Sequence, residues 1–160
     1  MNETFRGMKR YKQQLSESDC LRILTESRRA ALAVHGELGY PYAVPVNFVY
    51  LPEKRQVCFH CAREGHKLDA IRRDSKVCLT LWTDGVRQED GFDDVESVVI
   101  FGQAECVTDE AWREAIAQRL GYKYFPDTEM TARNIEQALH RTEIVAVTID
   151  HMTGKRIHEK

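Results

Sequence analysis

The stretch VCFHCAREGHKLDAI (residues 57–71) gathers side chains that can bind metals, exchange electrons or hold anions. It contains two cysteines in a C-x-x-C spacing, Cys58 and Cys61, with His60 between them and Lys67 shortly after. Three chemistries fit these residue types: a thiolate–imidazole metal site, a redox-active dithiol, and an anion site built on the basic residues.

The strand pattern of residues 56–62 argues against the first two chemistries. Side chains alternate across a strand, so Cys58 and Cys61 point to opposite faces and His60 shares a face with Cys58 only. Two thiols so placed cannot form a disulfide or one corner of a zinc site without a turn between them. No second C-x-x-C or paired histidine completes a metal set, and no helix begins at Cys58 to lower its pKa. We therefore predict no metal site.

The basic residues that follow lie where a helix is expected to begin, over roughly 65–74. A helix N-terminus offers unpaired N–H groups and a partial positive charge, so it binds anions. Lys67 in the first turn is opposed by that dipole unless an anion is present. Arg63, His66 and Lys67 are thus consistent with a phosphate site, and equally with a solvated helix end carrying ordinary surface cations.

Pro45 is unusual because it stands in the middle of an alternating strand, residues 42–50. Proline cannot donate a hydrogen bond to a sheet, so it marks an edge, a bulge or a place where another group meets the backbone. Asn47, on the same face, offers both a donor and an acceptor. Two interpretations stay open: an edge strand protected against aggregation, or a strand along which a ligand lies.

The elements that position these residues follow from hydrophobic periodicity. Six strands joined mostly by hairpins, with few helices between them, favour a mainly β fold, an antiparallel sheet closed into a small β-barrel with peripheral helices. The expected strands are 30–36, 42–50, 56–62, 76–83, 97–107 and 143–150, the expected helices are 16–27, 65–74, one from Asp109 and one at 130–140, and 84–96 is expected to be an acidic loop.

Composition sets the broad class of the protein. The chain has 160 residues, 42% hydrophobic and 30% charged, which suits one globular domain over residues 1–160. A net charge of -2 predicts no nucleic-acid partner, and no apolar run is long enough for a membrane span. The N-terminus has basic residues without an apolar run behind them, and the five cysteines are scattered, so we expect no signal peptide and a cytoplasmic protein with reduced thiols.

Three segments together resemble one family: GYPYAVPVNFVY, VCFHCAREGHKLDAIRRDSKVCL and ESVVIFGQAECV. They are similar to the nitroimidazole-resistance (Nim) family, within the pyridoxamine-5'-phosphate-oxidase-like flavin-binding split barrels, and the late HMTGK resembles that family's ending. The resemblance runs in order from about Phe5 to Lys155. It implies a six-stranded antiparallel split barrel of the FMN-binding type that forms a homodimer with FMN at the subunit interface.

The resemblance also assigns the residues of the cofactor site. The strand around Pro45 is expected to run beside the flavin ring, the strand end at His60 to lie close to it, the turn at Lys67 to hold the phosphate, and Ser97 to reach the flavin from the partner subunit. FAD is equally compatible because it shares that phosphate. Glu96 departs from the arginine that the family often shows there. The residues implied to bind the cofactor are Val44, Pro45, Val46, Asn47, His60, Cys61, Ala62, Gly65, His66, Lys67 and Ser97.

Three functions follow from these observations. The first is an FMN-dependent oxidoreductase that reduces small electron-poor substrates such as nitroimidazoles, with His60 as the catalytic candidate that donates a proton or orients the substrate. His60 could equally be a structural histidine. The second function is a pyridoxamine-phosphate oxidase proper, for which only Lys155, Arg156 and His158 are available near the C-terminus to bind a second phosphate. The third is a flavin- or haem-binding module without turnover. A Rossmann dinucleotide site is not expected, because no G-x-G-x-x-G follows a strand.

Overall fold

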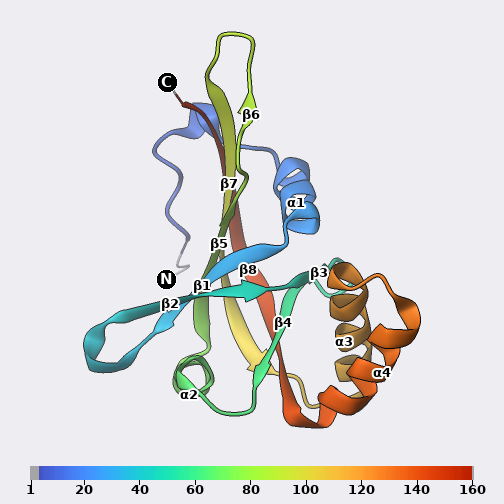
Figure 1. Ribbon diagram of the computed structural model, residues 1–160. Coiled ribbons are helices and arrows are strands. Elements are labelled where there is room, and N and C mark those ends of the chain that lie inside the picture. The colour runs from blue at the N-terminus through green and yellow to red at the C-terminus, as the bar shows by residue number, and fades with distance from the viewer. Residues whose placement is uncertain (1–3, 160) are drawn as a thin grey trace.

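The alternating apolar segments form strands that pair antiparallel into one curled sheet in this computed structural model, which describes residues 4–159 (Figure 1). The sheet order is β2-β1-β5-β7-β8-β4-β3, and β6 pairs with β7. The prediction of a mainly β, split-barrel fold with peripheral helices is confirmed. The strands are β1 Arg29–His35, β2 Pro41–Asn47, β3 Val49–Leu51, β4 Gln56–Ala62, β5 Lys76–Trp82, β6 Val86–Arg87, β7 Asp93–Cys106 and β8 Thr142–Glu159.

The segment from β2 to β3 closes the barrel, because its two strands form the two opposite edges of the sheet. β2 pairs with β1 at one edge, and β3 pairs with β4 at the other. The sequence predicts one strand over 42–50, and the structure corrects this, because Phe48 leaves both ladders. The Phe48 N–H donates to the Tyr124 hydroxyl over 2.9 Å, and that hydroxyl lies within reach of the Phe48 and Arg28 carbonyls. A tyrosine hydroxyl therefore supplies the hydrogen bonds that the sheet does not.

Within residues 4–159, four α-helices pack around the sheet, and three of them begin at a side-chain cap. Ser16, Asp109 and Asp127 each accept a hydrogen bond from a backbone N–H three residues on. In Figure 1, α3 packs against β3, β4 and β8, α4 lies alongside α3 on its outer side, and α2 lies at the lower end of the sheet. The helices are α1 Glu17–Glu26, α2 His66–Arg73, α3 Glu110–Tyr124 and α4 Thr128–Ala138, with short 3-10 helices at Tyr11–Gln13, Glu37–Gly39 and Leu139–Arg141.

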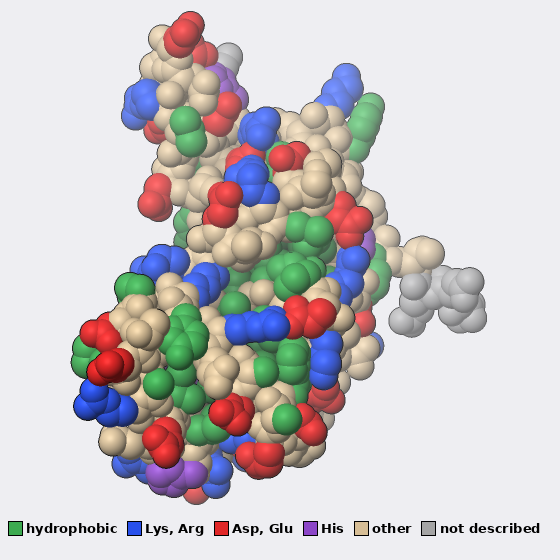
Figure 2. All heavy atoms as spheres, turned by 90° about the vertical axis from the view of Figure 1, so that its right-hand side faces the viewer, with side chains coloured by type: hydrophobic (Ala, Val, Ile, Leu, Met, Phe, Trp, Pro, Cys, Tyr) green, Lys and Arg blue, Asp and Glu red, His purple; other side chains and the backbone are tan. Residues whose placement is uncertain are grey.

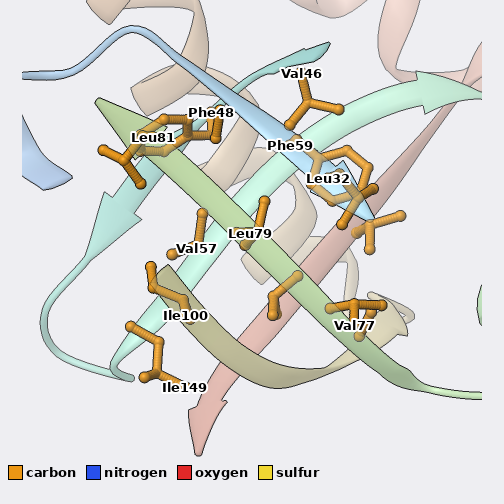
Figure 3. Close-up of a cluster of buried hydrophobic side chains, with 14 of the residues drawn as sticks. Leu32, Val46, Phe48, Val57, Phe59, Val77, Leu79, Leu81, Ile100 and Ile149 are labelled. Atoms are coloured by element: carbon orange, nitrogen blue, oxygen red, sulfur yellow. The ribbon is translucent and has the colours of Figure 1, made fainter. Parts of the chain in front are cut away.

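Two apolar cores lie on opposite faces of β4. The larger fills the barrel and includes Phe59 and Cys61, with the side chains of Figure 3 (Figure 3). The smaller includes Cys58 and packs β4 and β8 against α3. The predicted placement of Cys58 and Cys61 on opposite faces is therefore confirmed. Because both faces of β4 are covered, the side chains from Gln56 to Phe59 are all buried, and His60 is the first exposed residue of this strand.

The β7–β8 ribbon extends much further than the sequence indicates. Residues 84–96 are not only a loop, because β6 and the start of β7 lie within them, and the last strand runs to Glu159 rather than ending at 150. In Figure 1 this ribbon rises above the barrel. Cross-strand ion pairs hold it: Glu96 binds Arg156, and His158 lies 2.8 Å from a carboxylate oxygen of both Asp94 and Asp90. Among residues 4–159, no helix combines the length and apolar character needed to cross a membrane.

Candidate functional site

The strand that carries Pro45 lies at the edge of the sheet. β2 has β1 on one side only, and Pro45 is the register partner of Ala31. Such a strand accepts a proline where the proline nitrogen faces away from the neighbouring strand. Val44 and Val46 pack on the barrel core, whereas Pro45 and Asn47 are exposed. A ligand beside β2 would therefore touch Val44 and Val46 through backbone groups only.

Small side chains make the outer face of the sheet flat beside this edge. In register, Ala31 lies next to Thr80 and Thr80 next to Val99. Phe101, 43% exposed, and Trp82, 62% exposed, stand at either side of these small residues. We call this surface the outer platform; it consists of Ala31, Ala33, Ala43, Pro45, Cys78, Thr80 and Val99, which are half-buried or exposed.

Ser97 belongs to this outer face, whereas Glu96 does not. Ser97 lies between Trp82 and Lys155 in the ladder. The Glu96 side chain points to the opposite face, where Arg22 and Arg156 bind its carboxylate oxygens. These two arginines outweigh the effect of burial and hold the pKa of Glu96 below its ordinary value. Glu96 is thus a structural ion-pair residue, and its charge does not face the groups that surround Ser97.

The end of β4 presents His60 and Ala62 outward and Cys61 inward. Cys61 is only 8% exposed, so it can meet a ligand only through its backbone. Burial raises the pKa of the Cys61 thiol, and raises that of Cys58 to about 12, so neither forms a thiolate near neutral pH. Desolvation lowers the pKa of His60, and its ring makes no hydrogen bond within residues 4–159. Both ring nitrogens of His60 are therefore available to hydrogen-bond a ligand at this strand end.

The start of α2 is open to an anion. Gly65 has a φ of 137°, and no side chain caps the helix. Lys67 and Arg63 form no ion pair with any carboxylate of the described chain. The His66 ring stacks on Tyr42 of β2, with ring centroids 4.0 Å apart, and its buried Nε2 has no hydrogen-bond partner among the described residues. The stack joins the helix start to the edge strand.

A cavity of about 180 Å³ opens beside His60, between the ends of β4 and β8 and the hairpin formed by α3 and α4. Asn47 and His60 line it from the sheet. Leu120, Ile135 and Ile144 are among its apolar walls. Figure 2 looks onto this side of the molecule and shows apolar side chains gathered across it (Figure 2). Among the residues that the structure describes, no group of three or more His, Cys, Asp or Glu side chains is placed to hold a metal ion.

With this geometry established, comparison with known proteins decides the family. The family model described as pyridoxamine 5'-phosphate oxidase matches residues 16–156. The chain belongs to the pyridoxamine 5'-phosphate oxidase family. A search of curated proteins found none that matches.

Solved structures share the fold of this family member at low sequence identity. A proposed 5-nitroimidazole antibiotic resistance protein from Bacteroides thetaiotaomicron is 22% identical with a TM-score of 0.76, and the match covers 89% of this chain and 86% of that one. A flavocytochrome from Azotobacter vinelandii is 22% identical, TM-score 0.76, with coverage of 92% and 71%. A FAD binding protein from Mycobacterium smegmatis is 21% identical, TM-score 0.62, with coverage of 91% and 98%.

For this member of the pyridoxamine 5'-phosphate oxidase family, the structure brings most predicted site residues to two neighbouring places. The β2 edge and the α2 start are linked by the stack of Tyr42 on His66, and His60 and Asn47 share the cavity beside α3 and α4. Ser97 lies apart, at the far side of the outer platform near Trp82. Sequence reasoning missed Tyr42 and the α3–α4 wall. An aromatic residue three positions before Pro45 was the available signal for Tyr42.

Proposed function

We propose that this chain is a flavin-binding oxidoreductase, active as a homodimer, that reduces small electron-poor substrates such as nitro compounds. One observation carries the proposal. The edge strand β2 reaches both places: its Tyr42 stacks on His66 at the uncapped start of α2, and its Asn47 lines the cavity that His60 also lines. Each alone has an ordinary explanation, but together they match a planar ring that carries a phosphate on a flexible chain.

The chain's own residues suit a flavin. The unpaired edge of β2 offers backbone N–H and C=O groups to the polar edge of the ring, and the outer platform has the small side chains that a flat ring needs. The first-turn amides of α2, with Lys67 and Arg63, suit its phosphate. The buried Nε2 of His66 has no hydrogen-bond partner among the described residues, and a polar group of a bound ligand could provide one. We propose FMN as the cofactor; FAD presents the same phosphate, and one similar structure is a FAD binding protein.

The apolar outer face supports a homodimer. Trp82 and Phe101 are exposed there, and Phe5 stacks on His151 at its border with ring centroids 4.5 Å apart. Exposed apolar surface of this kind is typical of an interface, and a two-fold contact would cover it on both copies. Ser97, which lies on this face, would then reach the flavin held by the other copy.

His60 has the properties expected of a group beside the reacting atoms. Its lowered pKa keeps the imidazole neutral near pH 7, so it can donate a hydrogen bond to a substrate oxygen or pass on a proton. A bound flavin supplies two-electron transfer, by which a nitro group gains two electrons and two protons and becomes a nitroso group and water, while a reduced nicotinamide donor is oxidised. A second phosphate site is less well supported, because Arg156 is paired with Glu96.

The first test is the absorbance spectrum of the purified protein, followed by mass analysis of what heat releases. We expect a yellow protein that releases FMN and that sediments as a dimer. Stopped-flow mixing with NADPH or NADH and then with a nitro compound should bleach the flavin and restore its colour. A colourless protein that takes up no added FMN or FAD would contradict the proposal. Bound flavin that neither donor reduces would leave only the binding module.

A further inference from the structure

The cavity beside His60 has a chemistry of its own, distinct from that of the outer platform. We propose that it is the subsite for the apolar body of the substrate, and that it takes a small, uncharged, single-ring molecule whose polar edge faces His60 and Asn47. This inference rests on the proposed function, because it names the substrate class of that same site.

The walls of the cavity offer almost no hydrogen bonds to a ligand. The Thr131 hydroxyl donates to the Phe125 carbonyl, and the Thr142 hydroxyl donates to the Ala138 carbonyl, each over 2.8 Å. The Tyr124 hydroxyl is engaged at the β2–β3 break. Apart from His60, Asn47 and Asn134, the rest of the lining is apolar, and such walls bind the apolar part of a ligand.

Three exposed polar residues of the described lining have unused hydrogen-bonding capacity. His60, Asn47 and Asn134 line the cavity, and their side chains make no hydrogen bond within residues 4–159. His60 and Asn47 come from the strand ends that the proposed flavin site also uses. A molecule bound with its ring among the apolar walls would therefore present its polar edge to His60 and Asn47 and to the flavin site together.

Size and charge define the occupant. A volume of about 180 Å³ is close to the roughly 150 Å³ of an apolar cavity that is known to hold one benzene ring. No Asp, Glu, Lys or Arg is among the described lining residues, so no side chain there balances a charged ligand. The cavity is narrow because α4 approaches α3 closely at Gly121. A side chain at this position would not fit, since its Cβ would lie 2.8 Å from Thr131 Cγ2.

The test titrates flavin-loaded protein with nitrobenzene, and with benzoate as a charged ring of similar size, by calorimetry. The variants Ala117→Leu and Ala138→Leu add bulk inside the cavity, and Ala132→Leu adds the same bulk at an exposed position of α4 outside its lining. We expect nitrobenzene to bind the parent and Ala132→Leu alike, at least about tenfold more weakly to the two cavity variants, and more tightly than benzoate. Flavin affinity should be the same in all four proteins.

The outcomes separate the two proposals. A parent that takes up no flavin overturns the proposed function. Normal flavin uptake with equal nitrobenzene affinity in Ala117→Leu, Ala138→Leu and Ala132→Leu overturns the subsite alone, as does benzoate binding as tightly as nitrobenzene. Because Ala138 is exposed, its variant is expected to fold even if the half-buried Ala117 does not tolerate leucine, so the test does not depend on one substitution.

Discussion

Replacing Tyr124 by phenylalanine should destabilise the protein, because it removes a single hydroxyl at the place where the barrel closes. The ring would stay, and with it the contact of the Arg28 guanidinium 4.7 Å from the ring centroid. The Phe48 N–H would lose its acceptor at 2.9 Å, and Phe48 is 0% exposed, so water cannot replace it. A buried donor left unsatisfied costs about 1–3 kcal/mol.

The effect can be measured by thermal and urea unfolding. For a chain of this size each kcal/mol lowers the melting temperature by about 2–4 °C, so a loss of about 2 kcal/mol corresponds to about 4–8 °C. Burial raises the pKa of Tyr124, so the hydroxyl stays protonated and the loss should be the same at pH 6 and pH 8. Tyr122→Phe is the matched control, since Tyr122 is on the same helix, is exposed, and has no hydrogen-bonded hydroxyl within the described chain.

The reasoning would be refuted if Tyr124→Phe and Tyr122→Phe unfolded at the same temperature and the same urea concentration. Such a result would mean that water or a shifted backbone satisfies the Phe48 amide. The break between β2 and β3 would then be stable without help from α3.

Three further changes test the other charged groups. Lys67→Ala should weaken flavin binding roughly ten- to a hundredfold, because a charge-assisted hydrogen bond contributes about 1.5–3 kcal/mol. The control Lys12→Ala, at an exposed position, should leave flavin binding unchanged. Equal flavin affinities of the two variants in titrations would place the phosphate elsewhere. Arg113→Ala should lower the free energy of unfolding in urea by about 3–5 kcal/mol, because it breaks a buried 2.9 Å ion pair with Glu143 and hydrogen bonds to three backbone carbonyls. The control Arg133→Ala, which breaks an exposed ion pair with Glu129, should cost under about 1 kcal/mol. Similar losses in both variants would contradict a stabilising role for the Arg113 contacts. The hydrogen bonds that the His158 ring donates to the carboxylates of Asp94 and Asp90 raise the pKa of His158. The stabilisation from this pair is therefore complete below the ordinary pKa of histidine and is lost as pH rises through the raised pKa. Replacing His158 by glutamine should flatten the melting temperature between pH 6 and pH 8, and an unchanged profile would exclude His158 as the cause.

The sequence predicted best what depends on neighbours along the chain. Alternation places Cys58 and Cys61 on opposite faces, and the structure has them in two separate cores. Pro45 required an edge or an interruption, and β2 is an edge strand. These are local consequences of strand geometry and of a missing N–H, so a single sequence is enough to derive them.

What the sequence could not predict depends on distant partners. The alternation of apolar residues continues through Phe48, and the group that interrupts the strand there, Tyr124, lies 76 residues away. The start of β7 looked like a solvated acidic loop, because the cross-strand partner of Glu96, Arg156, is 60 residues later. The cavity beside His60 was missed for the same reason, since its walls come from α3 and α4 and its volume follows from how closely they pack.

The pairing of β4 with β8 has a consequence for protein synthesis. Ala62 pairs with Thr142, so about eighty further residues must be synthesised after β4 before its second neighbouring strand, β8, begins. At about 5–20 residues per second, the ribosome needs about 4–16 s to make them, and during that time one edge of β4 has no strand beside it. Every residue predicted to bind the cofactor has already been made by then. A chain that stops before Thr142 thus contains the whole set of predicted site residues and still leaves the strand of His60 without the partner that holds it in place.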